Sequence, residues 1–173
     1  MDGLDLVRAQ LDLTLRFAED ALNALTAHEE LWVPSIDSWT VREIDGVWVP
    51  DWAEPEPLLP PTTSIAWIQW HAIWWWSTVI NRSFGDGSLQ RQDVMWPGPT
   101  RSMALLDDLR EEWLGHLDHL SNEDLGSGTL TRWPYSDGRP FLFVVGWVNT
   151  ELMKNLSEIA LLRRMVPGPD ESS

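Results

Sequence analysis

The sequence predicts an all-α fold, a four-helix bundle with a long excursion rich in proline and tryptophan between its first and second helices. Four segments carry apolar residues at three- and four-residue steps, the period of one face of an α-helix. Little of the remaining chain alternates between apolar and polar residues, as a half-exposed strand would. The 173 residues suit a single domain over 1–173, with a tail at about 167–173 that we expect to be disordered.

The four helices are expected at about residues 4–27, 62–84, 100–120 and 140–165. The second begins near Thr62 to Ser64, which are good N-cap residues, and ends before Gly85. Its apolar positions cover most of its circumference, so we expect it to be the most buried of the four. Thr100 is expected to cap the third helix, and Pro140 suits the first turn of the fourth.

The excursion is marked by six prolines between residues 34 and 61, which forbid a long helix. Within it, residues 41–49 are expected to pair as a short hairpin around the Asp-Gly pair at 45–46, a common turn sequence. Three tryptophans of this stretch are too apolar to stay in water. They are Trp39, Trp48 and Trp52. We therefore expect the excursion to pack over one end of the bundle.

The charge of the chain limits its partners. A formal charge of −15, from 12 basic and 27 acidic residues, repels phosphate backbones and anionic lipids. The chain has no cysteine, which excludes disulfides, thiolate catalysis and cysteine-bound metal. No apolar run is long enough to span a membrane, and the first residues lack a signal-peptide pattern. We expect a cytoplasmic homodimer that binds a small molecule, and neither nucleic acid nor membranes.

Polar residues on faces that should be apolar are the candidates for chemistry, because burying them costs free energy unless they are paired or bind a metal. His71 lies inside the buried stripe of the second helix, and Glu151 and Asn155 lie on adjacent turns of the fourth. One interpretation is a metal site between facing helices, and the other is a buried hydrogen-bond network. Spacing alone favours the network, because a single core histidine usually finds a partner.

Four residues are expected to line the space around these groups. They are Trp67, Trp75, Val148 and Glu158. The neighbouring stripe of tryptophans at 67, 70 and 74 is interpreted mainly as core. The pair His116 and His119 is interpreted as a solvated helix face, and His28, next to Glu29 and Glu30, as a surface residue at the end of the first helix.

Two segments resemble a known family. Residues 64–76, SIAWIQWHAIWWW, resemble the second helix of the DinB-like (YfiT-like) four-helix-bundle family, and residues 149–163 resemble its last helix. The turn at 120–125 also fits, and the resemblance extends over about residues 4–165. It implies the same bundle fold that the periodicity predicts.

The resemblance also implies a divalent metal, often nickel or zinc, held by one histidine of the second helix and a His-x-x-x-His pair of the last. Here His71 keeps the first position, whereas Glu151 and Asn155 occupy the pair, a set that suits a harder ion such as manganese, or no ion. The implied activity is a metal-dependent transferase or hydrolase acting on a small molecule, with Glu151 as the catalytic ligand or base. Some relatives use a thiol cofactor, which these residues do not specify. The alternative is a metal-free ligand-binding bundle that has lost the family's histidine triad.

Overall fold

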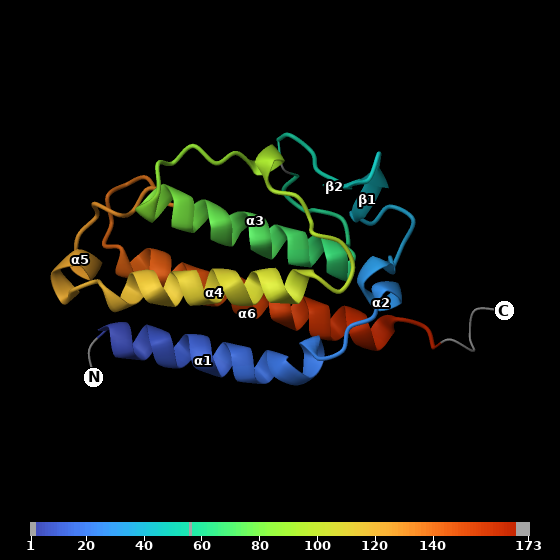
Figure 1. Cartoon of the computed structure of the whole chain (residues 1–173), viewed down its shortest axis with the longest axis horizontal. Helices are drawn as coiled ribbons and strands as arrows, with labels where there is room; N and C mark the ends of the chain where they lie inside the picture. Colours follow the sequence, from blue (N-terminus) through green and yellow to red (C-terminus); the bar gives the residue numbers. More distant parts are fainter. Residues whose placement is uncertain (1–2, 56, 169–173) are drawn as a thin grey trace.

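Four long helices build the protein, whose computed structural model describes residues 3–55 and 57–168 and the side chains of these residues except 17–21. They are α1 (Gly3–Leu22), α3 (Ile65–Phe84), α4 (Ser102–Asp118) and α6 (Leu142–Met165), and they lie along a common direction (Figure 1). Helix α6 packs against α1 and α3, and α3 packs against α4. The predicted all-α bundle is confirmed. Most of the tail at 167–173 lies outside the described residues.

The helix directions depend on one long connection. The segment between α3 and α4, which holds only the short 3₁₀ turn Arg91–Asp93, runs back along the length of the bundle. Helices α3 and α4 therefore point the same way, and α1 and α6 point the opposite way (Figure 1). None of the helices in the described ranges combines the length and the apolar character needed to cross a membrane.

The end of the first helix differs from the prediction. Helix α1 stops at Leu22 and does not continue to 27, because Ala24 adopts a positive φ of 56° that no α-helix accommodates. Thr26 then caps the short helix α2 (Ala27–Leu31) through a reciprocal capping box with Glu29. The chain thus turns sharply, and α2 lies against α3.

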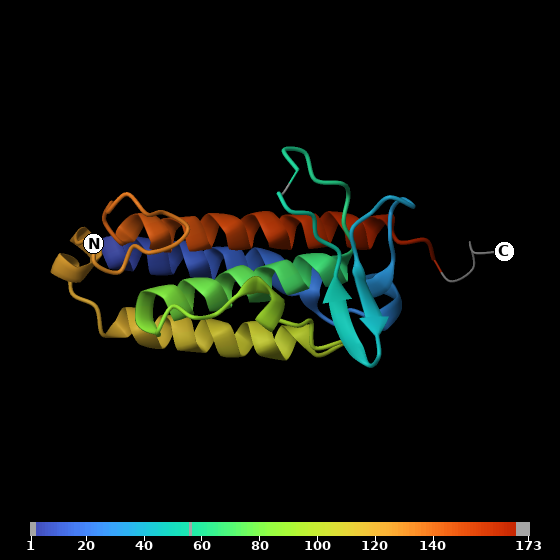
Figure 2. The ribbon, with the colours of Figure 1, turned by 90° about the horizontal axis from the view of Figure 1, so that it is seen from above.

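The excursion contains the predicted hairpin. Strands β1 (Val41–Ile44) and β2 (Val47–Pro50) pair antiparallel, and Asp45 and Gly46 between them both have positive φ. The hairpin crosses the bundle at the end where α3 begins (Figure 2). The excursion is tied to that end by two backbone hydrogen bonds of 2.9 Å, from Trp39 N to Thr62 O and from Ser64 N to Trp39 O.

Helix α3 is the most buried element, as predicted. Ser64 caps it by accepting a hydrogen bond from the Trp67 amide, and Gly85 ends it. Both predicted apolar stripes of this helix contribute to the core. A helix that is apolar around most of its circumference can only be stable inside such a core.

The starts of the other two long helices lie slightly later than predicted. Thr100 is not the cap of α4, because it has a positive φ of 63° and its amide binds Glu30, so α4 begins at Ser102. Pro140 precedes α6, whose first residue is Leu142. The short helix α5 (Asn122–Gly126) closes the far end of the bundle with a capping box of its own.

Candidate functional site

A pocket of about 310 Å³ lies where the excursion meets α3 and the second half of α6. We call it the His71 pocket. Its lining comes from the end of the excursion (Pro60, Pro61, Thr62 and Thr63), from α3 (Trp67 and His71) and from α6 (Lys154, Asn155, Glu158, Leu161 and Leu162). Its walls therefore depend on residues that are far apart in the sequence.

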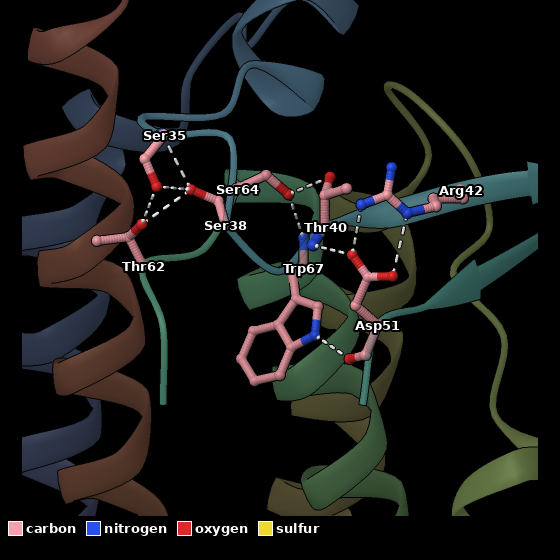
Figure 3. A network of polar contacts seen from close by, with 8 residues as sticks. All are labelled: Ser35, Ser38, Thr40, Arg42, Asp51, Thr62, Ser64 and Trp67. Atoms are coloured by element: carbon pink, nitrogen blue, oxygen red, sulfur yellow. Dashed lines mark hydrogen bonds and ion pairs between the residues drawn. The ribbon is translucent and has the colours of Figure 1, made fainter. Parts of the chain in front are cut away.

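A polar network fixes the excursion beside this pocket (Figure 3). The Asp51 carboxylate accepts hydrogen bonds from the Thr40 amide at 2.9 Å and from two nitrogens of Arg42 at 3.0 and 3.1 Å. The Asp51 carbonyl oxygen accepts a hydrogen bond of 2.8 Å from Trp67 Nε1. The Ser38 and Thr62 hydroxyls meet at 2.8 Å. The excursion thereby holds the indole of Trp67 in one orientation.

The Trp67 indole in turn positions His71. Their ring centroids are 5.1 Å apart with an interplanar angle of 11°, so the two rings are stacked one helical turn apart. Trp74 covers the imidazole from the other neighbouring turn, at a centroid distance of 5.6 Å. The His71 side chain is therefore confined between two indoles, and its own Nδ1 atom is shielded from water without a hydrogen-bond partner.

Burial keeps His71 uncharged. The pKa of this imidazole falls from 6.5 to about 4, mainly through loss of hydration and also through the positive charge of Lys154, while a hydrogen bond with Asn155 acts in the opposite direction. A neutral imidazole that lines a pocket at pH 7 serves as a hydrogen-bond partner for a bound molecule. A strongly shifted pKa in a cleft is also typical of functional sites.

Asn155 joins the site to the core. Its side chain is 2% exposed, and its Oδ1 accepts a hydrogen bond of 2.9 Å from Trp75 Nε1. Trp75 and Val148 were both predicted to line the pocket, but they are fully buried behind it and do not line it. The hydrogen bond from Trp75 therefore holds the Asn155 amide from the core side, and the opposite side of this amide lines the pocket.

Replacing Asn155 with leucine is expected to lower the free energy of unfolding by about 1–3 kcal/mol, because the buried Trp75 N–H would lose its acceptor. Urea unfolding of the variant measures this loss. In a Trp75→Phe background, which has no N–H, the same substitution should cost clearly less. Equal costs in both backgrounds would show that the hydrogen bond does not stabilise the fold.

The three charged residues of this part of α6 do not converge on His71. Glu151 Oε2 lies 2.5 Å from Lys154 Nζ, one turn along the same helix, and Glu151 is outside the pocket lining. Glu158 lines the pocket, where partial loss of hydration raises the pKa of its carboxyl. Among the hydrogen bonds and ion pairs of the described residues, none joins Glu151 to His71.

This arrangement is a poor fit for a divalent metal. The Asn155 oxygen already accepts from Trp75, and the Glu151 carboxylate is paired with Lys154. Among the side chains that the structure describes, no group of three or more His, Cys, Asp and Glu residues is placed to hold an ion. Glu151 does not line the pocket that His71 and Asn155 share, so the three predicted donors are not gathered around one position, and the catalytic role of Glu151 stays a prediction.

Sequence reasoning did not identify Lys154 or the excursion residues 60–63 as part of the pocket. The position of Lys154 three residues after Glu151 was a usable signal, since such pairs face each other on a helix. The pair His116 and His119 lies away from the His71 pocket. His116 stacks on Phe84 with a centroid distance of 4.1 Å, and His119 is exposed at the end of α4.

The comparisons with known proteins give one positive result. The model of the DinB superfamily matches residues 10–159, a range that contains all four long helices in whole or in part and every predicted site residue. A search of the curated proteins and of the solved structures finds no match to the chain. A family match over this much of the sequence agrees with the bundle and with the resemblance of its second and last helices. The chain therefore belongs to the DinB superfamily.

Proposed function

We propose that this protein binds a small, neutral organic molecule in the His71 pocket, and that binding requires no metal ion. The observation that carries the proposal is an uncharged, half-buried imidazole, stacked on Trp67, that lines a pocket of about 310 Å³. Known small-molecule sites begin at roughly this size and combine apolar walls with a few polar groups. The pocket has both features.

The charges around the pocket favour a neutral ligand. Lys154 supplies one positive charge, but Glu151 pairs with it at 2.5 Å and Glu158 stands on the same face of α6. His71 adds no charge at pH 7. An anionic ligand would lose its hydration and find Lys154 already paired with Glu151, and a cationic ligand that approached Glu158 would meet Lys154 in the same wall.

The walls favour a flat apolar body with one hydrogen-bonding group. The indole of Trp67, Leu162 and the two prolines at 60–61 offer apolar contact. His71 and Asn155 offer polar atoms at the same place, and a primary amide carries both a donor and an acceptor that match them. We therefore assign the ligand to the class of small aromatic amides.

The metal-dependent transferase or hydrolase stays a prediction beside this proposal. It would need the Glu151 carboxylate to turn from Lys154 toward the pocket that His71 and Asn155 line. The homodimer also stays a prediction, and it does not depend on the pocket.

Ligand-observed NMR with benzamide and indole-3-acetamide, in the presence of EDTA, tests the proposal. We expect saturable binding to the wild type, weaker binding of the charged analogues benzoate and benzylamine, and at least a tenfold loss of amide affinity in His71→Gln. His116→Gln is the matched control, because His116 packs on Phe84 outside this pocket, and it should bind as the wild type does. Binding that appears only after Zn²⁺, Ni²⁺ or Mn²⁺ replaces EDTA would contradict the proposal and favour the metal site.

A further inference from the structure

A second feature concerns Glu30, a carboxylate that is 1% exposed. Its Oε1 accepts a hydrogen bond of 3.0 Å from Gln69 Nε2, and its Oε2 accepts one of 2.8 Å from the Thr100 amide. Both donors are neutral, and none of the ion pairs among the described residues includes Glu30. A buried carboxylate without a nearby cation is costly, and this burial raises the pKa of Glu30.

Glu30 lies at one end of a pocket of about 750 Å³ formed by α1, the turn after it and α4. We call it the Glu30 pocket, and it is separate from the His71 pocket. Its apolar wall comes from Leu15, Leu22, Leu25 and Met103. A carboxylate has about four acceptor positions, of which Gln69 and Thr100 use two, so Glu30 retains the capacity to bind a further donor.

The other end of the Glu30 pocket carries the Arg110 guanidinium together with the Asp107 carboxylate. Arg110 is eight residues beyond Ser102, which places it about 12 Å further along α4. Its Nε is shielded from water without a hydrogen-bond partner, and its nearest carboxylate oxygens are at 3.9 Å on Asp107 and 4.0 Å on Glu111. The pocket therefore has a carboxylate at its buried end and, at the other end, a guanidinium whose Nε has no hydrogen-bond partner.

We propose that the Glu30 pocket binds a linear molecule that carries an ammonium group at one end and a carboxylate at the other. The ammonium group meets Glu30, the carboxylate meets Arg110, and an aliphatic spacer lies along Leu15 and Met103. The other charged residues of the lining are Asp12, Asp107 and Arg16. A ligand with a single charge would satisfy only one end.

The same contacts of Glu30 also hold α2, α3 and the start of α4 together, so the test must separate binding from folding. Isothermal titration with 8-aminooctanoate serves as the binding measurement, with octylamine and octanoate as single-charge controls. We expect saturable binding of 8-aminooctanoate and at least tenfold weaker binding of each control. Arg110→Gln should lose at least tenfold in affinity for 8-aminooctanoate, whereas Arg101→Gln, an exposed position just before the same helix, should not change.

A second variant tests the pocket itself. Leu15→Trp fills the apolar wall and should abolish binding while far-UV circular dichroism and the unfolding midpoint show that the bundle is retained. The proposal is overturned if the wild type does not bind 8-aminooctanoate, if octylamine binds equally well, or if either Arg110→Gln or a folded Leu15→Trp protein keeps the wild-type affinity. In that case Glu30 acts only as a connection between helices.

Discussion

Replacing Trp70 with alanine is expected to lower the free energy of unfolding by about 3–5 kcal/mol. The side chain is 0% exposed, and its Nε1 donates a 2.8 Å hydrogen bond to the Val94 carbonyl of the segment that returns to α4. It also stacks on Trp74 at a centroid distance of 5.9 Å and meets Trp52 edge-on at 6.0 Å. The substitution would leave a large cavity in the most buried helix and release the contact with the excursion.

Urea unfolding followed by far-UV circular dichroism measures this effect without relying on the fluorescence of 13 tryptophans. Trp70→Phe keeps an aromatic ring and should cost less than Trp70→Ala. Trp32→Ala is a matched control, since Trp32 is partly exposed and packs only at the edge of the core. A loss below about 1 kcal/mol for Trp70→Ala would mean that the core can close around the missing ring.

Lowering the pH from 6.5 to about 4 is expected to cost the wild type up to about 3 kcal/mol more than it costs a His71→Gln variant. The unfolded chain takes up a proton on His71 near pH 6.5, whereas the folded chain resists it until about pH 4. Between these values the unfolded state binds more protons, so the stability provided by neutral His71 is present above pH 6.5 and is lost as the pH falls.

Other groups titrate in the same range, so the comparison needs a variant. The pKa values of Glu30 and Glu158 are raised in the fold, mainly by burial. Raised carboxyl pKa values make stability fall as the pH rises from the unfolded value of about 4.5, the opposite sense to His71. Subtracting the unfolding curve of His71→Gln removes both contributions. If the free energy of unfolding depended on pH in the same way for the wild type and for His71→Gln, His71 would not be held as a neutral imidazole in the fold. His116→Gln should show the same pH dependence as the wild type.

Periodicity and end signals were sufficient to predict much of the fold. The apolar steps located the four long helices, Ser64 marked the start of α3, and the Asp-Gly pair marked the hairpin turn. These are local features, so residues close in sequence determine them. The position of Ala24 shows where this reasoning ends, because nothing in an apolar stripe indicates a residue with positive φ.

The end of α1 before Ala24 explains why the sequence did not indicate that Glu30 is buried. On a helix continuing to residue 27, the acidic pair after it belongs to a solvated end. In the structure the chain turns, and α2 directs Glu30 toward Gln69 and Thr100. Gln69 lies in the buried helix that the sequence already indicated. A glutamine fully buried among tryptophans was therefore the available sign that a polar partner had to reach it.

The sequence indicated which helix faces carry the residues of the candidate site, but it did not indicate which partners their side chains contact. Spacing placed His71 and Asn155 toward the same interior, and both line one pocket together with Trp67 and Glu158. Spacing did not indicate that Glu151 would turn to Lys154, because a helical step fixes the face of a residue but not the partner that its side chain selects. The walls contributed by residues 60–63 depend on the tertiary position of the excursion.

The most direct test of the central claim is an NMR titration of the ¹⁵N-labelled protein with benzamide at pH 7 in EDTA, following the imidazole nitrogens of His71. We predict that His71 resonates as a neutral imidazole and shifts saturably with benzamide, while His116 does not move. If instead the His71 signals do not shift with benzamide and shift with stoichiometric Zn²⁺, this site is a metal centre and the proposed metal-free binding of aromatic amides is wrong.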